Sequence, residues 1–188
     1  TRKDFYELES KLVFAKSWTF VGFAHDLAQV GDITPLEVAG QPLFLVRSSK
    51  NKIRAFHNVC RHRNLKLVGE PKNCKSLITC PYHNWCYNLD GQLRAAPFFG
   101  GQKTELPKDF KLKEHGLLEV SCELFHDWIF VNLNCDTVSL ESHLAPLRKQ
   151  LAGIYLDDFV VVSSIEFGEI KTNWKLLMEN FIEPYHVQ

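Results

Sequence analysis

Two short segments of this chain each carry one cysteine and one histidine, and together they limit what the surrounding residues can fold into. Cys60 and His62 stand one residue apart in the first segment, C-R-H-R-N. Cys80 and His83 stand two residues apart in the second segment, C-P-Y-H-N-W, and seventeen residues separate the two. Two thiolates and two imidazoles can bind a soft or borderline metal. We therefore expect two loops that close on one metal site.

The spacing of the ligands favours one kind of metal site over another. Zinc fingers and knuckles usually pair their ligands as C-x2-4-C and H-x3-5-H, with one ligand type in each pair. Here both pairs are mixed, and the first pair is very tight. Mixed pairs suit a binuclear [2Fe–2S] cluster, in which one iron takes both cysteines and the other takes both histidines. Zinc, and four side chains that merely pack in the core, are the two weaker alternatives.

The residues around these ligands resemble the two cluster-binding loops of Rieske proteins. Asn64 and Asn84 stand where the family pattern has glycine, and asparagine is the non-glycine residue that best tolerates a left-handed backbone. High-potential Rieske proteins carry an extra cysteine in each loop, joined as a disulfide, where this chain has Leu65 and Tyr82. The chain therefore resembles the low-potential group found in oxygenases and their ferredoxins.

The resemblance assigns a role to each ligand. It implies a [2Fe–2S] cluster bound by Cys60, His62, Cys80 and His83. It also implies that His62 and His83 form the exit for electrons, because their ring N–H groups face outward.

Composition limits the class of protein. The 188 residues are 45% hydrophobic, which indicates a globular chain with a core. Lysine plus arginine and aspartate plus glutamate both number 22, so the net charge of zero gives no support for a nucleic acid or an anionic membrane as partner. No apolar run approaches the roughly 20 residues of a membrane span. We recognise no signal peptide, and the free thiols expected for the other cysteines lead us to expect a cytoplasmic location.

Four further cysteines have no metal-site spacing. The chain is not a small secreted scaffold, so we expect these residues to be buried free thiols rather than disulfides: Cys74, Cys86, Cys122 and Cys135. The chain begins with threonine, and we expect its amino terminus to be trimmed or incomplete.

The hydrophobic pattern predicts a mainly β fold. Residues 4–18 have helical spacing, whereas residues 18–56 form short apolar runs separated by turns at Gly31-Asp32 and Ala39-Gly40. Pro35 suggests an edge position, and Asp90-Gly91 predicts a hairpin with a type I′ turn. Residues 117–120 and 128–133 are expected to be the last strands. We predict an antiparallel barrel or sandwich with a cluster-binding subdomain.

A second domain is expected to begin near residue 136. Residues 139–155 have leucines at helical spacing, and residues 159–162 and 165–167 read as strands of a new sheet. We therefore divide the chain into an amino-terminal helix (1–17), a Rieske [2Fe–2S] domain (18–135) and the start of an α+β catalytic domain (136–188) that is not complete at residue 188.

The tail N-W-K-L-L-M-E-N-F-I-E-P-Y-H resembles the segment that opens the catalytic domain of Rieske non-haem iron oxygenases. The resemblance makes His186 the first ligand of a mononuclear Fe(II), which two histidines and a carboxylate hold with open positions for O2. The other two ligands are expected beyond Gln188.

The resemblance also makes Glu183 the electron bridge between the two metals. The family usually has aspartate there, and the longer side chain resembles members acting on quaternary ammonium compounds. Taken alone, the tail could also be a structural amphipathic helix, which Pro184 would kink.

Together these features resemble the large (α) subunit of a Rieske non-haem iron oxygenase, or an amino-terminal portion of it. The resemblance implies electrons from NAD(P)H, delivered by a ferredoxin and/or flavin reductase, and a homotrimer or an α3β3 assembly. The implied reaction is O2-dependent hydroxylation or demethylation of a small organic substrate. An aromatic compound is favoured and a quaternary ammonium compound is possible, and the portion alone is expected not to oxygenate.

Two other classes of protein remain open. A Rieske ferredoxin-like electron carrier would have the cluster without an active site, but it would not need the residues after about 136. A zinc-stabilised β module would differ in its metal content.

Overall fold

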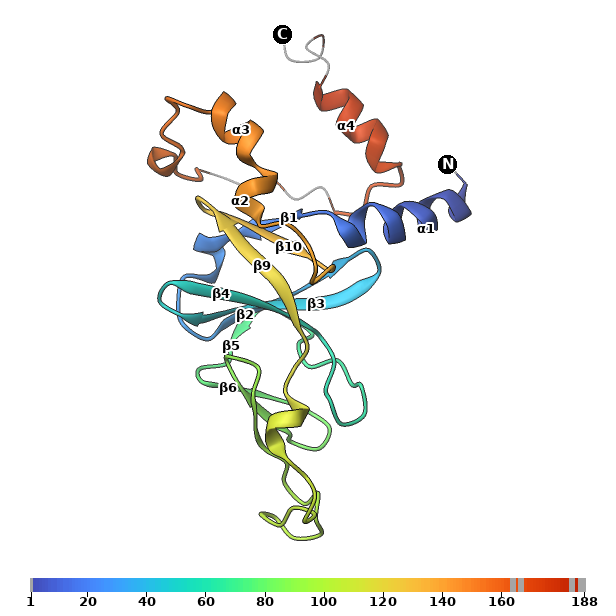
Figure 1. Ribbon diagram of the computed structural model, residues 1–188, viewed down its shortest axis with the longest axis vertical. Helices are drawn as coiled ribbons and strands as arrows, with labels where there is room; N and C mark the ends of the chain where they lie inside the picture. Colours follow the sequence, from blue (N-terminus) through green and yellow to red (C-terminus); the bar gives the residue numbers. More distant parts are fainter. Residues whose placement is uncertain (1, 163–164, 166–167, 183–184, 186–188) are drawn as a thin grey trace.

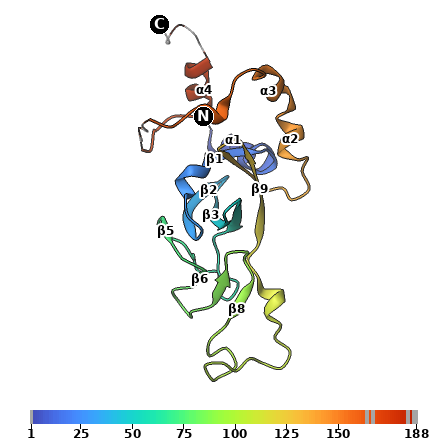
Figure 2. The same ribbon diagram turned by 90° about the vertical axis from the view of Figure 1, so that its left-hand side faces the viewer.

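The computed structural model describes residues 2–162, 165, 168–182 and 185. Two antiparallel sheets follow one another along the long axis of the molecule (Figure 1). The seven-stranded sheet lies nearer the helices, and the three-stranded sheet lies at the opposite end, as the turned view in Figure 2 also shows. No helix among the described residues is long and apolar enough to cross a membrane.

The larger sheet has the strand order β1-β10-β9-β4-β3-β2-β5, and every neighbouring pair is antiparallel. Its strands are β1 (Thr19–Phe23), β2 (Asp32–Val38), β3 (Gln41–Ser49), β4 (Lys52–His57), β5 (Lys72–Asn73), β9 (Glu119–Phe125) and β10 (Trp128–Asn132). The mainly β, antiparallel architecture predicted from the sequence is confirmed.

The turn between β2 and β3 explains their tight pairing. Ala39 and Gly40 form a two-residue connection in which both residues have positive φ, at 51° and 75°. This is the type I′ geometry whose twist matches that of the flanking strands. Strand β5 pairs only with the first two residues of β2, so Pro35 has a partner strand on one side only. The edge-like position predicted for this proline is therefore confirmed.

Strand β3 contributes to two hydrophobic cores. Leu43 and Leu45 belong to the core enclosed by the large sheet, whereas Phe44 and Val46 belong to the core beneath the metal loops. Successive side chains of a strand point to opposite faces, so β3 packs against one core on each of its two faces. A strand buried on both faces reads as a continuous apolar run, which is the pattern of these four residues.

The smaller sheet consists of β6 (Leu77–Thr79), β7 (Cys86–Asn88) and β8 (Leu93–Ala95). The predicted hairpin is present, but the predicted turn type is wrong. Asn88 and Gln92 close the loop through a backbone hydrogen bond of 3.0 Å, and only Gly91 has positive φ, at 80°. A three-residue loop that ends in a left-handed residue therefore replaces the type I′ turn. A Cβ atom at Gly91 would lie 2.5 Å from the Phe56 ring, so the glycine is also needed for close packing.

The first helix is shorter than the periodicity suggested. Helix α1 covers Lys3–Leu12, and a 3-10 turn at Phe14–Lys16 follows it. The predicted helix over residues 139–155 is divided into α2 (Leu140–His143) and α3 (Ala145–Gln150). Pro146 is in the first turn of α3, where it cannot donate a backbone hydrogen bond, and this residue ends the regular pattern.

The strand predicted at residues 159–162 is wrong: these side chains are 53% to 92% exposed, and no strand in the described part of the chain pairs with them. Helix α4 covers Trp174–Ile182. Short 3-10 segments occur at Ala24–Leu27, Leu112–His115 and Leu156–Asp158.

Candidate metal centre

The two cysteine–histidine loops have the same backbone hydrogen bonds. In the first, the Asn64 N–H donates to the Cys60 carbonyl at 2.9 Å, and the Cys60 N–H donates to the carbonyl of the residue after Asn64 at 2.8 Å. In the second, the Asn84 N–H donates to the Cys80 carbonyl at 3.0 Å, and the Cys80 N–H donates to the Trp85 carbonyl at 2.9 Å. Each cysteine is therefore held at the base of a closed turn.

The two asparagines occupy the left-handed backbone predicted from the sequence. Asn64 and Asn84 both have φ at 55°. Asparagine adopts this conformation more readily than other non-glycine residues. The departures from the family pattern therefore preserve the shape of both loops.

The four side chains proposed as ligands lie where the two loops meet, with Cys60 close to Cys80 and His62 close to His83. Cys60 and Cys80 are 1% and 2% exposed, and both thiols are free. The ring centroids of His62 and His83 lie 4.7 Å apart. The loops therefore bring together all four residues that the sequence predicted.

Two unpartnered nitrogen atoms indicate what these side chains bind. Nδ1 of His62 and Nδ1 of His83 are buried and have no hydrogen-bond partner. Buried polar atoms in proteins are nearly always satisfied, so two adjacent exceptions require a ligand. A metal ion accepts these lone pairs, and the two buried sulfur atoms complete a set of two nitrogen and two sulfur donors. This donor set fits a [2Fe–2S] cluster held by two residues on each iron.

The arrangement fits a binuclear group better than a single ion. Among the described residues, no group of three or more His, Cys, Asp or Glu side chains is placed to hold one metal ion. A structural zinc ion needs four such ligands around one point. A binuclear cluster needs only two protein ligands at each iron, and the paired loops provide that number.

Burial shifts the pKa values of Cys60 and His62 in the protein without metal. It is the largest cause that raises the pKa of the Cys60 thiol. It also lowers the pKa of the His62 imidazole, and the neighbouring His83 and Arg63 add to this shift. A neutral imidazole keeps a free lone pair for a metal, whereas a thiol must lose its proton. Assembly of the cluster at Cys60 is therefore expected to release a proton.

Tyr87 is a hydrogen-bond partner of the Cys60 sulfur, and no sequence pattern pointed to it. Its hydroxyl oxygen lies 3.3 Å from Cys60 Sγ and accepts the Arg61 N–H at 3.1 Å. Because the oxygen is already an acceptor, its hydrogen is free to point at the sulfur. Burial and the Cys60 contact raise the pKa of this hydroxyl, so it stays protonated.

Aromatic rings fix the orientation of both histidines. The Trp85 ring is stacked on His62, with centroids 4.8 Å apart and planes 6° apart. The Tyr82 ring lies 3.8 Å from the His83 ring. Phe99 meets both His62 and Trp85 edge to face, at 5.6 Å and 5.2 Å. The sequence showed Tyr82 and Trp85 only as neighbours of His83 and gave no signal for Phe99.

Asn58 closes the first loop from inside the core. Its side-chain oxygen accepts the N–H groups of Leu67 and Val68 at 3.0 Å and 2.9 Å, and its amide donates to the Val68 carbonyl at 2.8 Å. The residue is fully buried. It therefore ties the end of β4 to the chain that leaves the first loop. In the sequence, the signal for this role is an asparagine two residues before Cys60.

The second metal site, which the sequence predicts in the tail, lies outside the described residues. Glu183, the proposed bridge, and His186, the proposed iron ligand, are both among the residues not described. The same holds for Gln188, beyond which the other two iron ligands are expected. The assignment of this site therefore stays a prediction from the sequence.

The four cysteines outside the loops have different outcomes. All four are free thiols, as predicted. Cys74, Cys86 and Cys122 are partly buried, but Cys135 is exposed, so its predicted burial is wrong.

Comparison with known proteins agrees with this geometry. Residues 17–107 match the Rieske [2Fe-2S] domain family. The chain is 35% identical over 181 residues, 96% of its length, to the glycine betaine monooxygenase oxygenase subunit of Chromohalobacter salexigens, of which it covers 39%. It is also 30% identical to the large oxygenase component of salicylate 5-hydroxylase from Ralstonia sp. That alignment is 194 residues long with its gaps, and it covers 99% of this chain and 46% of the relative.

A solved structure extends the likeness to the whole chain. The crystal structure of the quaternary ammonium Rieske monooxygenase CntA with its substrate γ-butyrobetaine superposes with a TM-score of 0.86 at 29% identity. The match covers 100% of this chain and 53% of the other. The chain thus spans about half or less of the length of the proteins that it matches.

Proposed function

The chain contains a Rieske [2Fe-2S] domain and belongs with the oxygenase subunits of Rieske oxygenases, and from this premise we propose that it serves O2-dependent hydroxylation or demethylation of an organic substrate. The observation that carries the proposal is the pair of buried, unpartnered Nδ1 atoms of His62 and His83 beside two buried thiols. When bound there, the cluster supplies and accepts single electrons.

The chain's own residues have distinct tasks in this proposal. Cys60 and Cys80 hold one iron, and His62 and His83 hold the other. Trp85 and Tyr82 keep the imidazole rings in place, and Asn58 keeps the first loop closed. The hydrophobic core beneath the loops excludes water from the sulfur side of the site.

We assign the second metal by sequence. His186 is proposed as the first ligand of a mononuclear Fe(II), with its other ligands beyond Gln188, and Glu183 as the acid that bridges the two metal sites. We also keep the division at residue 136 between a Rieske domain and a catalytic domain as part of the proposal. Electrons are proposed to come from NAD(P)H through a partner ferredoxin or flavin reductase, and the assembly to be a homotrimer or α3β3.

A quaternary ammonium substrate has more support than the aromatic substrate first favoured. The relative acting on glycine betaine is 35% identical to the chain, against 30% for the relative acting on salicylate. Glu183 in place of the usual aspartate agrees with this choice. We propose a small quaternary ammonium compound as the substrate.

A simple electron carrier has less support. The family match to the Rieske domain ends at residue 107, whereas the likeness to oxygenase subunits extends over 96% or more of the chain. A carrier would not need the residues beyond the domain.

Metal analysis of the complete protein tests the proposal. We expect the absorption and electron paramagnetic resonance spectra of a Rieske cluster, together with one iron beyond the two of the cluster. His186→Ala should leave the cluster spectrum intact and abolish turnover of glycine betaine. A colourless protein loaded with zinc, or a His186→Ala variant that retains turnover, would overturn the assignment.

A further inference from the structure

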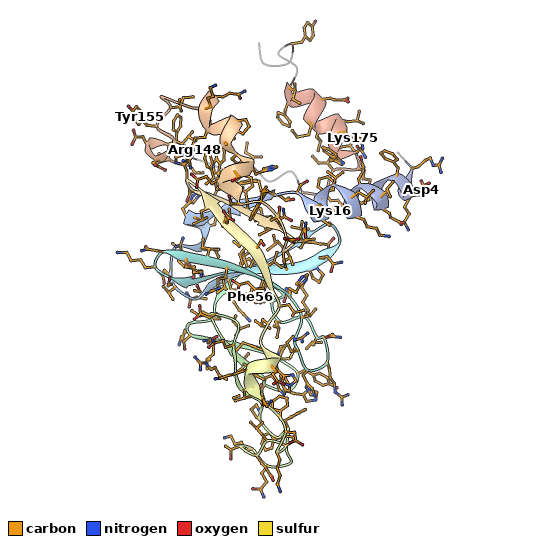
Figure 3. The ribbon with its side chains drawn as sticks, in the orientation of Figure 1. Asp4, Lys16, Phe56, Arg148, Tyr155 and Lys175 are labelled. Carbon is orange, nitrogen blue, oxygen red and sulfur yellow. The ribbon has the colours of Figure 1, made fainter. Side chains whose placement is uncertain are left out.

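The turn between β7 and β8 is bound to the large sheet at three points. The Leu117 N–H donates to the Gly91 carbonyl at 2.7 Å, and Gly91 packs so closely on the Phe56 ring that a Cβ atom there would collide with it. Figure 3 shows Phe56 at the junction of the large sheet and the part of the chain below it. The third point is Arg54 of β4, whose Nε donates to Asp90 Oδ1 at 3.0 Å. The hairpin is therefore held at its turn as well as through its strands.

Arg54 binds two carboxylates at once. Its Nη1 donates to Glu119 Oε1 of β9 at 2.5 Å, while its Nε is bound to Asp90. The Arg54 side chain is 18% exposed, against 54% for Asp90 and 50% for Glu119. An isolated ion pair at the surface contributes little stability, but a planar guanidinium that joins two carboxylates fixes their relative position. Arg54 therefore connects β4, β9 and the hairpin turn.

The strands of the hairpin are short and their pairing is irregular. Strands β7 and β8 have three residues each, and so has β6, the other neighbour of β7. The register between β7 and β8 shifts between Cys86 and Tyr87. A hairpin of this kind is at best marginally stable without contacts to other elements. We therefore expect the contacts of the turn with the large sheet to determine where β7 lies.

Strand β7 carries the hydroxyl that meets a proposed ligand. Tyr87 stands three positions before Asp90, and its hydroxyl oxygen lies 3.3 Å from Cys60 Sγ. Hydrogen bonds weaken steeply as their geometry is lost, so a displacement of β7 would weaken this one. Hydrogen bonds to the sulfur atoms of a [2Fe–2S] cluster influence its reduction potential, and they favour the more negative, reduced state. The position of the hairpin turn therefore bears on the potential of the cluster.

We propose that Arg54 is a positioning residue: through Asp90 it holds the Tyr87 hydroxyl at its hydrogen bond with Cys60, and it thereby raises the reduction potential of the cluster. This inference rests on the function proposed above, because it requires the [2Fe–2S] cluster. It differs from two simpler roles of Arg54. A purely structural role would change the stability of the protein alone, and a purely electrostatic role would depend on charge alone.

Two substitutions of Asp90 separate these roles, because they change the charge equally. Asp90→Ala removes the charge and the acceptor, whereas Asp90→Asn removes the charge but keeps an oxygen that can accept the hydrogen bond from Arg54 Nε. Loss of the negative charge would by itself raise the potential of the cluster in both variants alike. The potential is measured in the complete protein by a redox titration of the cluster absorbance. Both substitutions are also made in the Tyr87→Phe background.

We expect Asp90→Ala to have a lower reduction potential than Asp90→Asn. The difference should be smaller than the shift that Tyr87→Phe causes, because the hydroxyl is displaced and not removed. In the Tyr87→Phe background the two substitutions should give equal potentials, because no hydroxyl is left to position. Arg54→Lys keeps the charge but cannot bind both carboxylates with a planar group, so it should lower the potential below that of the wild type.

The outcomes separate this inference from the proposed function. Equal potentials for Asp90→Ala and Asp90→Asn, with the cluster present, would overturn the inference alone. A difference that persists in the Tyr87→Phe background would also overturn it, because Arg54 would then act without the hydroxyl. Loss of the cluster absorbance in Asp90→Ala alone would show that the ion pairs hold the loops and not the hydroxyl, which is a third contrary result. A wild type without the absorbance of a Rieske cluster would refute the proposed function and, with it, this inference.

Discussion

The Trp85 ring lies flat against the His62 ring, with the two planes only 6° apart. Trp85 is 2% exposed, and Phe99 and Phe110 meet it edge to face at 5.2 Å and 5.7 Å. The orientation of His62, a proposed iron ligand, is therefore set by the hydrophobic core that contains Trp85.

Replacing Trp85 by leucine should loosen this ligand. Loss of the large ring leaves a cavity, and we expect the free energy of unfolding to fall by about 2–4 kcal/mol. The cluster should also bleach faster in air, because water reaches His62. The decay of the cluster absorbance and a urea titration measure the two effects. Trp128→Leu, in a different core, should lower stability without faster bleaching. Bleaching of Trp85→Leu at the wild-type rate would refute the prediction.

Removal of the Tyr87 hydroxyl should lower the reduction potential of the cluster. The hydroxyl lies 3.3 Å from Cys60 Sγ, and a hydrogen bond to sulfur favours the more negative, reduced state. A difference of about 1 kcal/mol between the two states corresponds to about 40 mV for one electron. Tyr87→Phe should therefore lower the potential by about 40 mV in a redox titration. Tyr82→Phe, which loses an exposed hydroxyl, is the control and should leave the potential unchanged.

Replacing Asn58 by leucine should open the first loop. Leucine has a similar size but leaves the N–H groups of Leu67 and Val68 and the Val68 carbonyl without partners. Each buried unsatisfied group costs about 1–3 kcal/mol, so unfolding should become easier by at least about 3 kcal/mol. Iron content per chain should fall as well. Asn73→Leu removes three side-chain hydrogen bonds away from the loops and should keep the iron. Full iron content in Asn58→Leu would contradict this account.

The thiol of Cys122 should resist alkylation. Burial, with the nearby Glu119 and Glu123, raises its pKa to about 12. At pH 8 its thiolate fraction is then about 10³ times lower than that of an ordinary thiol. Iodoacetamide should modify the exposed Cys135 first, and mass spectrometry of peptides distinguishes the two. Modification of Cys122 at the rate of Cys135 in folded protein would show that burial does not protect it.

The raised pKa of the Cys122 thiol also predicts that the folded protein loses stability at alkaline pH. The pKa of Cys122 in the folded chain lies above the ordinary value of 9.0. The unfolded chain therefore loses this proton first as the pH rises, which favours unfolding. The contribution of Cys122 is complete below pH 9 and should disappear as the pH rises toward 12. A Cys122→Ser variant should show a flatter decline in urea titrations across this range.

The convergence of the two loops could be predicted from the sequence because the spacing of the proposed ligands is local. Cys60, His62, Cys80 and His83 need only two short loops, and Asn64 and Asn84 could be placed in the left-handed region by residue type alone. The antiparallel sheet was predictable for the same reason, since turns and apolar runs alternate over short distances.

What could not be predicted depends on contacts between distant residues. Tyr87 reaches Cys60 across 27 positions, and Lys175 reaches Glu9 across 166. Helix ends were also misjudged where one residue outweighs periodicity, as Pro146 does between α2 and α3. Figure 3 shows Lys175 above the segment that carries Asp4 in α1 and Lys16 in the 3-10 turn after it, a proximity that no periodic pattern contains.

The shared strand β3 has a consequence for engineering. Its alternating residues serve the sheet core on one side and the core under the metal loops on the other. A slip of one residue would exchange the faces and place Leu43 and Leu45 where Phe44 and Val46 now pack. A designer who transplants the two loops into another scaffold would therefore have to move β3 and its partner β4 with them. The smallest unit that can be transplanted therefore consists of the two loops together with β3 and β4.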